Sequence, residues 1–493
     1  MKQDDLYTII QNMTKQEKIF FNRYAQVANN KKNKHYMSLF KLIERQLKKS
    51  NAVDEKLLKE KFQYLSVEKR YLANILINAL TAFHEKKDGF YLAKTWIKQI
   101  RILIDKGAFT KAQKLHSKAV ALAEQHGLFE DLMILSNLKI DLCDVRPYVS
   151  DLSKTEDLID EKQVSINQTT NYDQYRLLHN QILDWTKKYG YIDSAAKKEA
   201  FDALVEVPIM QDIKYALSNR AKKAYFMIKT YICILRYDSP GQYEVCREFN
   251  AFIDQHPYLY DAYNKIIFTY NYVSCCIGIG CLQQSEAQLK SLDEQIEAYS
   301  NRVGYMQAFS YMSHLRLNSQ FGLFEKHPIW IGKVEEGLLQ YQDISPEQLE
   351  FIALYVGRAY MELGDYEKAL DYLYKIREYK ALGNDSIHYS AAKLLMLICY
   401  YELGWYSNLE STMNSFYRQI RQNDIQFKLY ESFLKYLKNK AAYNNKAVLE
   451  AYYAEWERYE QDARERIPFQ YFHYKEWLKG KIEQQSLSAY FQS

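Results

Sequence analysis

Apolar residues recur three and four positions apart along most of this 493-residue chain, with polar residues between them. This spacing places the apolar side chains on one face of a helix, so the pattern predicts a succession of amphipathic α-helices. In the N-terminal region the predicted helices span 14–28, 35–49, 54–63 and 66–86. Only seven prolines and sixteen glycines interrupt the chain, which favours long helices joined by short connections.

Two of the predicted helices begin with complete capping signals. Thr14 and Glu17 have the spacing of a capping box, in which each side chain bonds the other residue's backbone N–H. Ser345 and Gln348 form a second box, and Pro346 between them occupies the first helical position, where its missing N–H costs nothing. Both signals indicate that helices start at these residues.

A glycine-centred pattern recurs at near-constant spacing and predicts where helices are joined. In its clearest copy, Gly364 is followed by the large Tyr366, the small Ala369 and the apolar Leu373. Glycine ends a helix by adopting the left-handed conformation, and a small residue lets the next helix pack closely. The predicted corners are Gly107, Gly241, Gly280, Gly322, Gly364 and Gly404. The last five lie 39, 42, 42 and 40 residues apart, an interval typical of stacked helix pairs.

Several positions fit this spacing less well. Gly190 begins a weaker copy, and Gly127 falls outside the interval and is interpreted as a chance match. A turn near Pro147 and the polar stretch 144–175 predict a long exposed helix. A final helix is predicted to begin around Pro468 and to cap the apolar end of the array.

An uncharged run of twenty residues, 266–285, contains three cysteines and raises the question of a membrane span or a metal site. It holds too many polar residues for a span. Cys275, Cys276 and Cys281 lack the repeated paired spacing of a structural zinc site. We interpret the run as a corner at Gly280, with Cys276 in the first helix and Cys281 starting the second, and we expect no bound metal.

The stretch "ALYVGRAYMELGDYEKALDYLYKI" resembles a tetratricopeptide repeat, because Gly357, Tyr360, Gly364, Tyr366 and Ala369 stand at that family's signature spacing. The whole arrangement is similar to a bacterial group of tetratricopeptide-like proteins, although its units are longer than the family's. The resemblance implies an all-α fold, a right-handed α-solenoid of stacked helix pairs with an N-terminal helical subdomain. It implies no activity.

Charge and length extend this interpretation to three predicted regions. Residues 1–90 hold eighteen Lys+Arg against ten Asp+Glu, a net charge of +8 within a chain of net +5. We therefore predict a basic N-terminal helical subdomain at 1–89, helical repeats at 90–445 and C-terminal capping helices at 446–493. The N-terminus lacks a secretory apolar core, and seven cysteines are an odd number without framework spacing, so we expect a cytoplasmic protein.

Enzyme signatures do not occur in the sequence. It contains no phosphate-binding P-loop, no G-x-S-x-G nucleophile elbow and no H-E-x-x-H zinc motif. We expect a non-enzymatic protein without cofactor or metal. The composition and the repeats favour a scaffold that binds a protein or peptide partner.

The family resemblance also implies where such a partner binds. In tetratricopeptide proteins the first helix of each pair lines the concave groove, and Arg101, Arg316 and Arg358 each stand six residues before a corner glycine. Arginines there could bind a carboxylate or a phosphate through two parallel hydrogen bonds. The alternative is that they pair with local glutamates, such as Glu362 with Arg358. The apolar groove wall is predicted to consist of Phe309, Met312, Phe351, Leu354 and Tyr401.

A second hypothesis is nucleic-acid binding or transcription regulation by the basic N-terminal region, with a ligand-sensing repeat body. The stretch "DEKLLKEKFQYLSVEKRYLANIL" has the outline of a helix-turn-helix, with Ser66 capping a second helix that carries Lys69 and Arg70 near its start. Two features argue against it. The turn lacks glycine, and the second helix is apolar enough to lie in a core.

Overall fold

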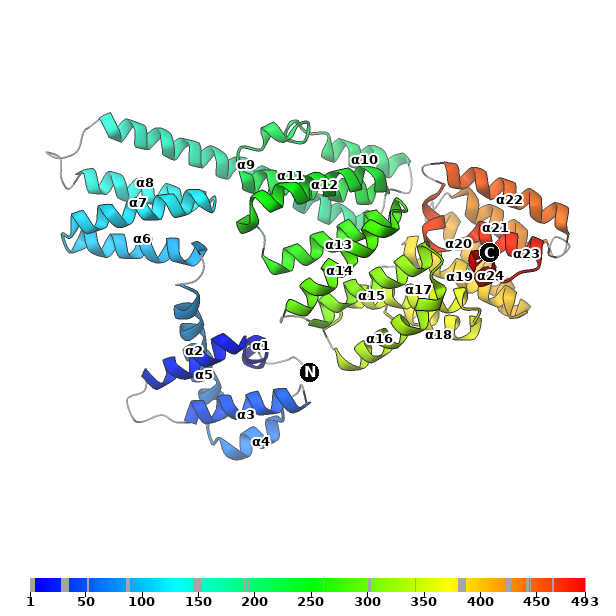
Figure 1. The fold of residues 1–493 in the computed structure, drawn as a ribbon, viewed down its shortest axis with the longest axis horizontal. Helices are drawn as coiled ribbons and strands as arrows, with labels where there is room; N and C mark the ends of the chain where they lie inside the picture. Colours follow the sequence, from blue (N-terminus) through cyan, green and yellow to red (C-terminus); the bar gives the residue numbers. More distant parts are fainter. Residues whose placement is uncertain are drawn as a thin grey trace. The chain divides into compact units, whose positions relative to one another are not determined.

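The structure, a computed structural model, is all-α in the residues that it describes (Figure 1). Those residues contain twenty-four α-helices and short 3-10 helices, and no β-strand. The predicted turn near Pro147 and the weak repeat copy at Gly190 lie outside the described residues. The structure describes residues 5–27, 35–50, 53–85, 89–144, 153–189, 192, 195–259, 261–299, 303–341, 343–379, 387–422, 427–439, 443, 445–462 and 465–492.

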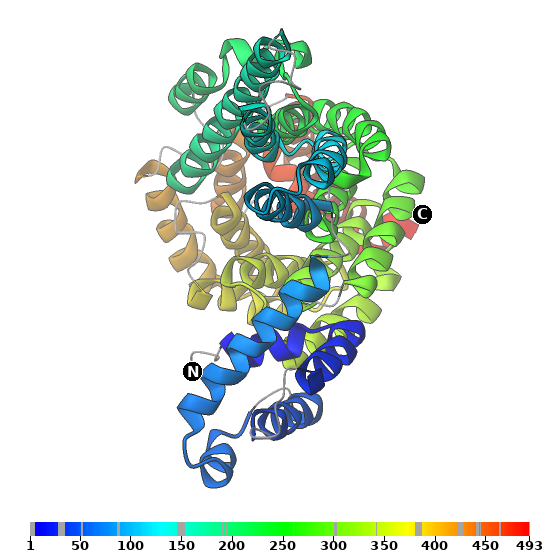
Figure 2. The same cartoon turned by 90° about the vertical axis from the view of Figure 1, so that its left-hand side faces the viewer.

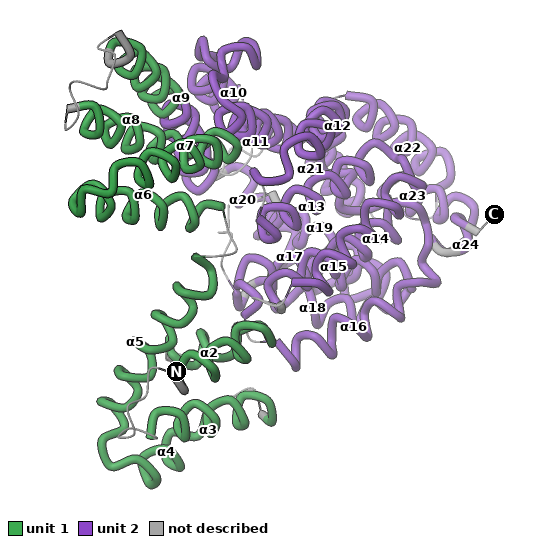
Figure 3. The backbone as a smooth tube through the Cα atoms, turned by 60° about the vertical axis from the view of Figure 1, so that its left-hand side comes forward, with its two compact units in different colours: residues 1–171 green, residues 172–493 purple. Residues whose placement is uncertain are grey.

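The chain divides into two compact units, residues 1–171 and 172–493 (Figure 3). The division falls inside one long helix, α9, so the predicted regions 1–89, 90–445 and 446–493 stay a prediction. The helices up to that point are α1 (Asp5–Asn12), α2 (Lys15–Val27), α3 (His35–Ser50), α4 (Glu55–Lys61), α5 (Leu65–His84), α6 (Gly89–Asp105), α7 (Phe109–Gln125), α8 (Phe129–Asp144) and α9 (Ser153–Tyr189).

The second unit continues with helices of similar length, most of them 14 to 18 residues. A 3-10 helix, η6 (Ile467–Tyr471), precedes the last two α-helices. The α-helices are α10 (Ala195–Val205), α11 (Asn219–Leu235), α12 (Ser239–Gln255), α13 (Ala262–Gly278), α14 (Leu282–Ala298), α15 (Val303–Gln320), α16 (His327–Gln340), α17 (Pro346–Glu362), α18 (Tyr366–Tyr379), α19 (Ile387–Glu402), α20 (Tyr406–Gln422), α21 (Lys428–Lys438), α22 (Lys446–Gln461), α23 (Tyr474–Glu483) and α24 (Leu487–Gln492).

The N-terminal helices follow the hydrophobic pattern closely, with two corrections. The four predicted helices correspond to α2, α3, α4 and α5, and the Thr14–Glu17 capping box is confirmed by bonds of 2.7 and 3.2 Å. The short helix α1 was not predicted. Helix α5 begins at Leu65 with Tyr64 at the cap position and no side-chain cap, so the prediction that Ser66 caps it is wrong. Ser66 already lies inside the first turn.

Consecutive helices of the second unit pack as pairs, and each pair packs on the next (Figure 2). The first helices α13, α15, α17 and α19 contact one another in order, and each second helix contacts the first helix of the following pair. The predicted cap of α17 is confirmed: Ser345 and Gln348 form the capping box, with Pro346 at the helix start. The apolar faces of neighbouring pairs pack into three successive hydrophobic clusters along the unit.

Corner glycines join the helices of most pairs. Gly107, Gly280, Gly322, Gly364 and Gly404 all have positive φ, between 67° and 81°, a conformation that side chains with a Cβ rarely adopt. Where α17 meets α18, Gly357 lets the helices approach: a Cβ on it would lie 2.9 Å from the Leu373 side chain. The buried Ala369 is the small residue on the facing helix.

Two corner assignments need correction. Gly241 lies inside α12, and the chain turns instead at Tyr237, whose φ is 53°. Asp238 caps α12 by accepting from the Gly241 N–H at 2.9 Å, and a Cβ on Gly241 would collide with that carboxylate. Gly127 is a true corner between α7 and α8, with φ 60°, and not a chance match.

The C-terminal segment 465–483, which we call the C-terminal strap, starts differently from the prediction. Pro468 lies in the 3-10 helix η6, and the final helices begin later, at Tyr474 and Leu487. In Figure 2 this red segment lies among the green and yellow helices of the second unit. Buried strap residues include Ile467, Phe472 and Trp477, so the strap is part of the core of that unit.

Candidate functional site

The first helices of five successive pairs line one cavity in the second unit. The cavity has a volume of about 510 Å³, within the range of small-ligand and peptide sites. Residues of α11, α13, α15, α17 and α19 contribute to its wall, and Gln470 and Tyr471 of the strap complete it. Four of the predicted groove residues lie together here: Phe309, Met312, Arg316 and Phe351.

Arg316 supplies the positive charge of this cavity. Its Nη1 donates to the Ser274 hydroxyl at 3.1 Å, and its guanidinium lies over the Tyr355 ring, 5.9 Å from the centroid. Ser274 stands 42 residues before Arg316, at the equivalent position of the preceding pair. The repeat therefore holds the guanidinium between two neighbouring first helices, with one neutral partner and one aromatic partner.

The other titratable groups near Arg316 are mostly uncharged at neutral pH. Burial raises the pKa of Tyr270 to about 12, so it remains a phenol. Burial, and secondly the charge of Arg316, lowers the pKa of His388 to about 3, so its ring is neutral. An exposed carboxylate, Glu347, also lies on the wall. The Tyr270 and Phe309 rings pack 4.5 Å apart, which places an aromatic surface beside the cation.

A second cavity of about 430 Å³ adjoins the first, since Arg316 and Gln470 line both. Arg358 and Arg466 are also on its wall, together with Glu460. The two arginines one repeat apart thus border the same space, as their common position before the corner glycines predicts. Their surroundings differ, however, because Arg358 is buried whereas Arg316 is half-buried.

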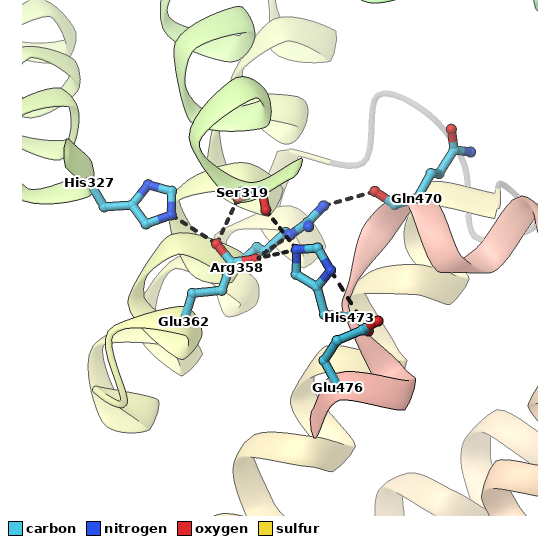
Figure 4. A network of polar contacts seen from close by, with 7 residues as sticks. All are labelled: Ser319, His327, Arg358, Glu362, Gln470, His473 and Glu476. Carbon is cyan, nitrogen blue, oxygen red and sulfur yellow. Dashed lines mark hydrogen bonds and ion pairs between the residues drawn. The ribbon is translucent and has the colours of Figure 1, made fainter. Parts of the chain in front are cut away.

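Arg358 is buried and holds the C-terminal strap, so its assignment to an open groove is wrong (Figure 4). Its Nε donates to Glu362 at 2.7 Å, and its Nη1 donates to the Gln470 carbonyl at 2.8 Å. Glu362 is completely buried and also accepts from Ser319 at 2.6 Å and from His327 at 2.8 Å. The alternative of pairing with a local glutamate is the one that the structure contains. We call these residues, together with His473, the strap network.

His473 completes the strap network from the strap side (Figure 4). Its Nε2–H donates to the Ser319 carbonyl at 2.6 Å and lies 3.9 Å from a Glu362 oxygen. Burial, followed by the charge of Arg358, lowers the pKa of His473 to about 4. Burial alone would raise the pKa of Glu362, but the Arg358 charge and the His327 hydrogen bond hold it at about 2. At neutral pH the network therefore contains one carboxylate, one guanidinium and a neutral His473.

Further contacts fix the strap on α19. The Tyr471 hydroxyl and His388 Nδ1 are 2.9 Å apart, which closes the first cavity at that side. Glu402 accepts from Trp477 at 2.5 Å and from Lys481 at 2.6 Å. These bonds span 75 to 83 residues of sequence, so the cavity wall is built from both ends of the second unit.

The remaining predicted groove residues lie elsewhere. Leu354 is 2% exposed and belongs to the core between helices, so it does not face a groove. Tyr401 is covered by Tyr443 and Trp477, with ring centroids 4.7 and 5.6 Å away. The assignments of Leu354 and Tyr401 are corrected. Arg101 is exposed on α6 in the first unit, and its place in a groove stays a prediction.

Sequence reasoning missed several residues of the cavity. Ser274 had a signal, because it stands six residues before Gly280, as Arg316 does before Gly322. The strap residues Gln470 and Tyr471 had none, because the repeat pattern does not extend to them. Their place depends on contacts more than eighty residues away in the sequence.

The segment with a helix-turn-helix outline is packed against its own unit. Lys69 pairs with Glu55 at 2.5 Å and lies 4.4 Å from the Tyr7 ring centre, so its charge is used internally. Arg70 is exposed.

In the second unit, Cys275 and Cys276 are buried in α13, and Cys281 is the exposed residue before α14. No cluster of three or more potential metal ligands occurs in the described part of the chain.

No protein-family model matches this chain, and no curated protein is similar to it in sequence. None of the helices that the structure describes combines the length and apolar character needed to cross a membrane.

Proposed function

We propose that this protein is a non-enzymatic scaffold that binds a protein or peptide partner on the first-helix face of a tetratricopeptide-like, right-handed helical superhelix. The partner presents an anionic group to Arg316. The motif around Gly364 supports the family resemblance, and the ordered packing of the pairs in the second unit is compatible with it. A guanidinium can bind a carboxylate through two parallel hydrogen bonds.

One observation carries the proposal: five successive first helices contribute to one cavity that contains Arg316. Arg316 contacts the Ser274 hydroxyl and the Tyr355 ring, and these contacts orient its guanidinium at the cavity wall. The adjacent Phe309, Met312 and Phe351 offer apolar surface for a side chain next to the bound anion. A site with this composition favours an acidic peptide that also carries apolar residues.

The test compares Arg316→Gln with a matched control. Arg247→Gln removes an arginine from α12, where its side chain is 61% exposed and paired with Glu244. Labelled acidic peptides with varied apolar residues are screened on the intact protein by fluorescence polarisation. Because a charge-assisted hydrogen bond contributes about 1.5–3 kcal/mol, Arg316→Gln should weaken the bound peptides by roughly ten- to a hundredfold. Arg247→Gln should leave them unchanged.

Circular dichroism of both variants provides the folding control. Equal affinity of the selected peptides for the wild type and for Arg316→Gln would refute this site. The nucleic-acid hypothesis is not carried forward, because Lys69, one of its two key cations, is engaged with Glu55 and Tyr7.

A further inference from the structure

The first unit carries a groove with an apolar floor and a row of lysines. It lies between α6 and α7 and has a volume of about 460 Å³. Ile102, which is 58% exposed, lies on α6 at its floor. We call it the basic groove, and the residues that matter here are Ile102, Leu103, Lys111, Lys114, Leu115 and Lys118.

The lysines of the basic groove form a row along one face of α7. Positions 111, 114 and 118 fall on one face of α7 over two turns, about 10 Å along the helix axis. All three side chains are exposed. Residues 89–125 hold seven Lys+Arg against two Asp+Glu, a net charge of +5, so the surroundings reinforce the positive potential.

The same unit carries a surface of opposite character at the start of α9. Its acids lie in the turns just before Val164, which is 55% exposed and stands four residues after Asp160. The acids span about 8 Å of helix, which matches the lysine row in length. We call this surface the acidic face, and it consists of Glu156, Asp157, Asp160, Glu161 and Val164.

The two surfaces do not cover each other within one chain. Figures 1 and 3 both place α8 between α9 and α6. The lysines of the basic groove and the acids of the acidic face are all exposed. Each chain therefore presents both halves of a complementary contact to its surroundings.

We propose that the basic groove binds the acidic face of a second copy of this chain. The apolar floor receives Val164, and the lysines pair with the acids that precede it on α9. Since every copy has both surfaces, two copies can make the contact twice around a twofold axis. Charge pairing gives the contact its register and its salt dependence, while the apolar floor supplies desolvated area.

The experiment measures the mass of the full-length chain by sedimentation equilibrium. At about 0.05 M salt the mass should approach twice 58.6 kDa. At about 1 M salt, where the Debye length is about 3 Å, the dissociation constant should rise at least tenfold. A wild-type chain that stays monomeric at low salt overturns the proposal, even if a foreign acidic helix binds the groove.

Charge reversal provides the decisive comparison. One variant carries K111E, K114E and K118E, and the other carries E156K, D157K and D160K. Each alone should be monomeric, because its groove and its acidic-face position then have the same sign. A mixture of the two should form a heterodimer, since each mutated surface meets an opposite charge on the other variant.

Substitutions of the exposed apolar residues test the floor separately. Val164→Asp should weaken self-association at least tenfold, whereas Ile329→Asp, at a residue 61% exposed on α16, should not. All of these side chains are exposed, so circular dichroism should show unchanged helicity. The assignment of this surface is overturned if either charge-reversed variant alone forms dimers. It is also overturned if a mixture of the two variants forms no heterodimer.

Discussion

Replacing Glu362 with glutamine should release the C-terminal strap. The carboxylate accepts hydrogen bonds from Arg358, Ser319 and His327, and all of its surface is buried. Glutamine has nearly the same volume, so packing is conserved while the negative charge is lost. Its NH2 group would also face donors. The guanidinium of Arg358 would remain buried beside the strap without its counter-ion.

Two independent routes give the size of the effect. The pKa of Glu362 is lowered from 4.5 to about 2, and this difference corresponds to about 3 kcal/mol of stabilisation at neutral pH. Breaking a buried ion pair by removing one partner costs about 3–5 kcal/mol. Both values refer to the same interaction and do not add. We expect Glu362→Gln to lower the free energy of strap opening by about 3–5 kcal/mol.

Hydrogen exchange read by mass spectrometry is the appropriate assay, because a chain of two units need not unfold in one step. Peptides covering α23 should exchange roughly two to four orders of magnitude faster in the variant. The matched control is Asp365→Asn, which breaks an exposed ion pair with Lys368. It should change the free energy of strap opening by less than about 1 kcal/mol. Replacing both buried partners, Arg358→Met with Glu362→Leu, should cost less than Glu362→Gln alone.

The same assay has a pH dependence of known sign. The folded pKa of Glu362, about 2, is below its ordinary 4.5, so its stabilisation is complete above pH 4.5 and is lost as the pH falls toward 2. The folded pKa of His473, about 4, is below its ordinary 6.5, so acidification from 6.5 to 4 also favours opening. A free energy of strap opening that is unchanged in Glu362→Gln would refute this account of the network. So would a free energy of opening that rises between pH 7 and pH 4, once the exchange rates are corrected for the slower intrinsic exchange of amides in acid.

Two further predictions concern a corner and the N-terminal region. Gly364→Ala should destabilise the second unit by about 1 kcal/mol, because φ is 81° although a Cβ there meets nothing within 4 Å. Gly332→Ala, equally open but inside α16, should instead stabilise by up to about 1 kcal/mol, and both are measured by denaturant unfolding. Lys69→Gln with Arg70→Gln should leave binding to duplex DNA unchanged in a mobility-shift titration at several salt concentrations. A steeply salt-dependent shift that the double variant abolishes would revive the nucleic-acid hypothesis.

The sequence by itself was enough to determine the helices and most of their junctions, because these features are local. A helix needs only a 3.6-residue apolar period, and the capping boxes at Thr14 and Ser345 act within one turn. Glycines such as Gly280 and Gly364 mark corners because few other residues adopt positive φ. The constant interval between them placed Arg316 on a first helix next to its equivalents.

The sequence pattern misplaced one corner, because a residue other than glycine adopts the positive φ there. At the corner before α12, Tyr237 takes the positive φ and Asp238 caps the helix, so the nearby Gly241 serves the cap and not the turn. Glycine can mark either a corner or a tight cap. Its presence in a repeat frame does not distinguish the two, and only the backbone conformation does.

Only the tertiary structure decided which of two equivalent arginines is buried. Arg316 and Arg358 have the same place in the repeat, yet Arg358 is buried by a strap whose Gln470 lies 112 residues away. A periodic pattern describes contacts between neighbouring pairs and contains nothing about a segment that returns from the end of the chain. The energy of such a contact comes from desolvation and from an ion pair formed after the array has assembled. For that reason the all-α packing of helix pairs could be predicted from the sequence, whereas the burial of Arg358 by the strap could not.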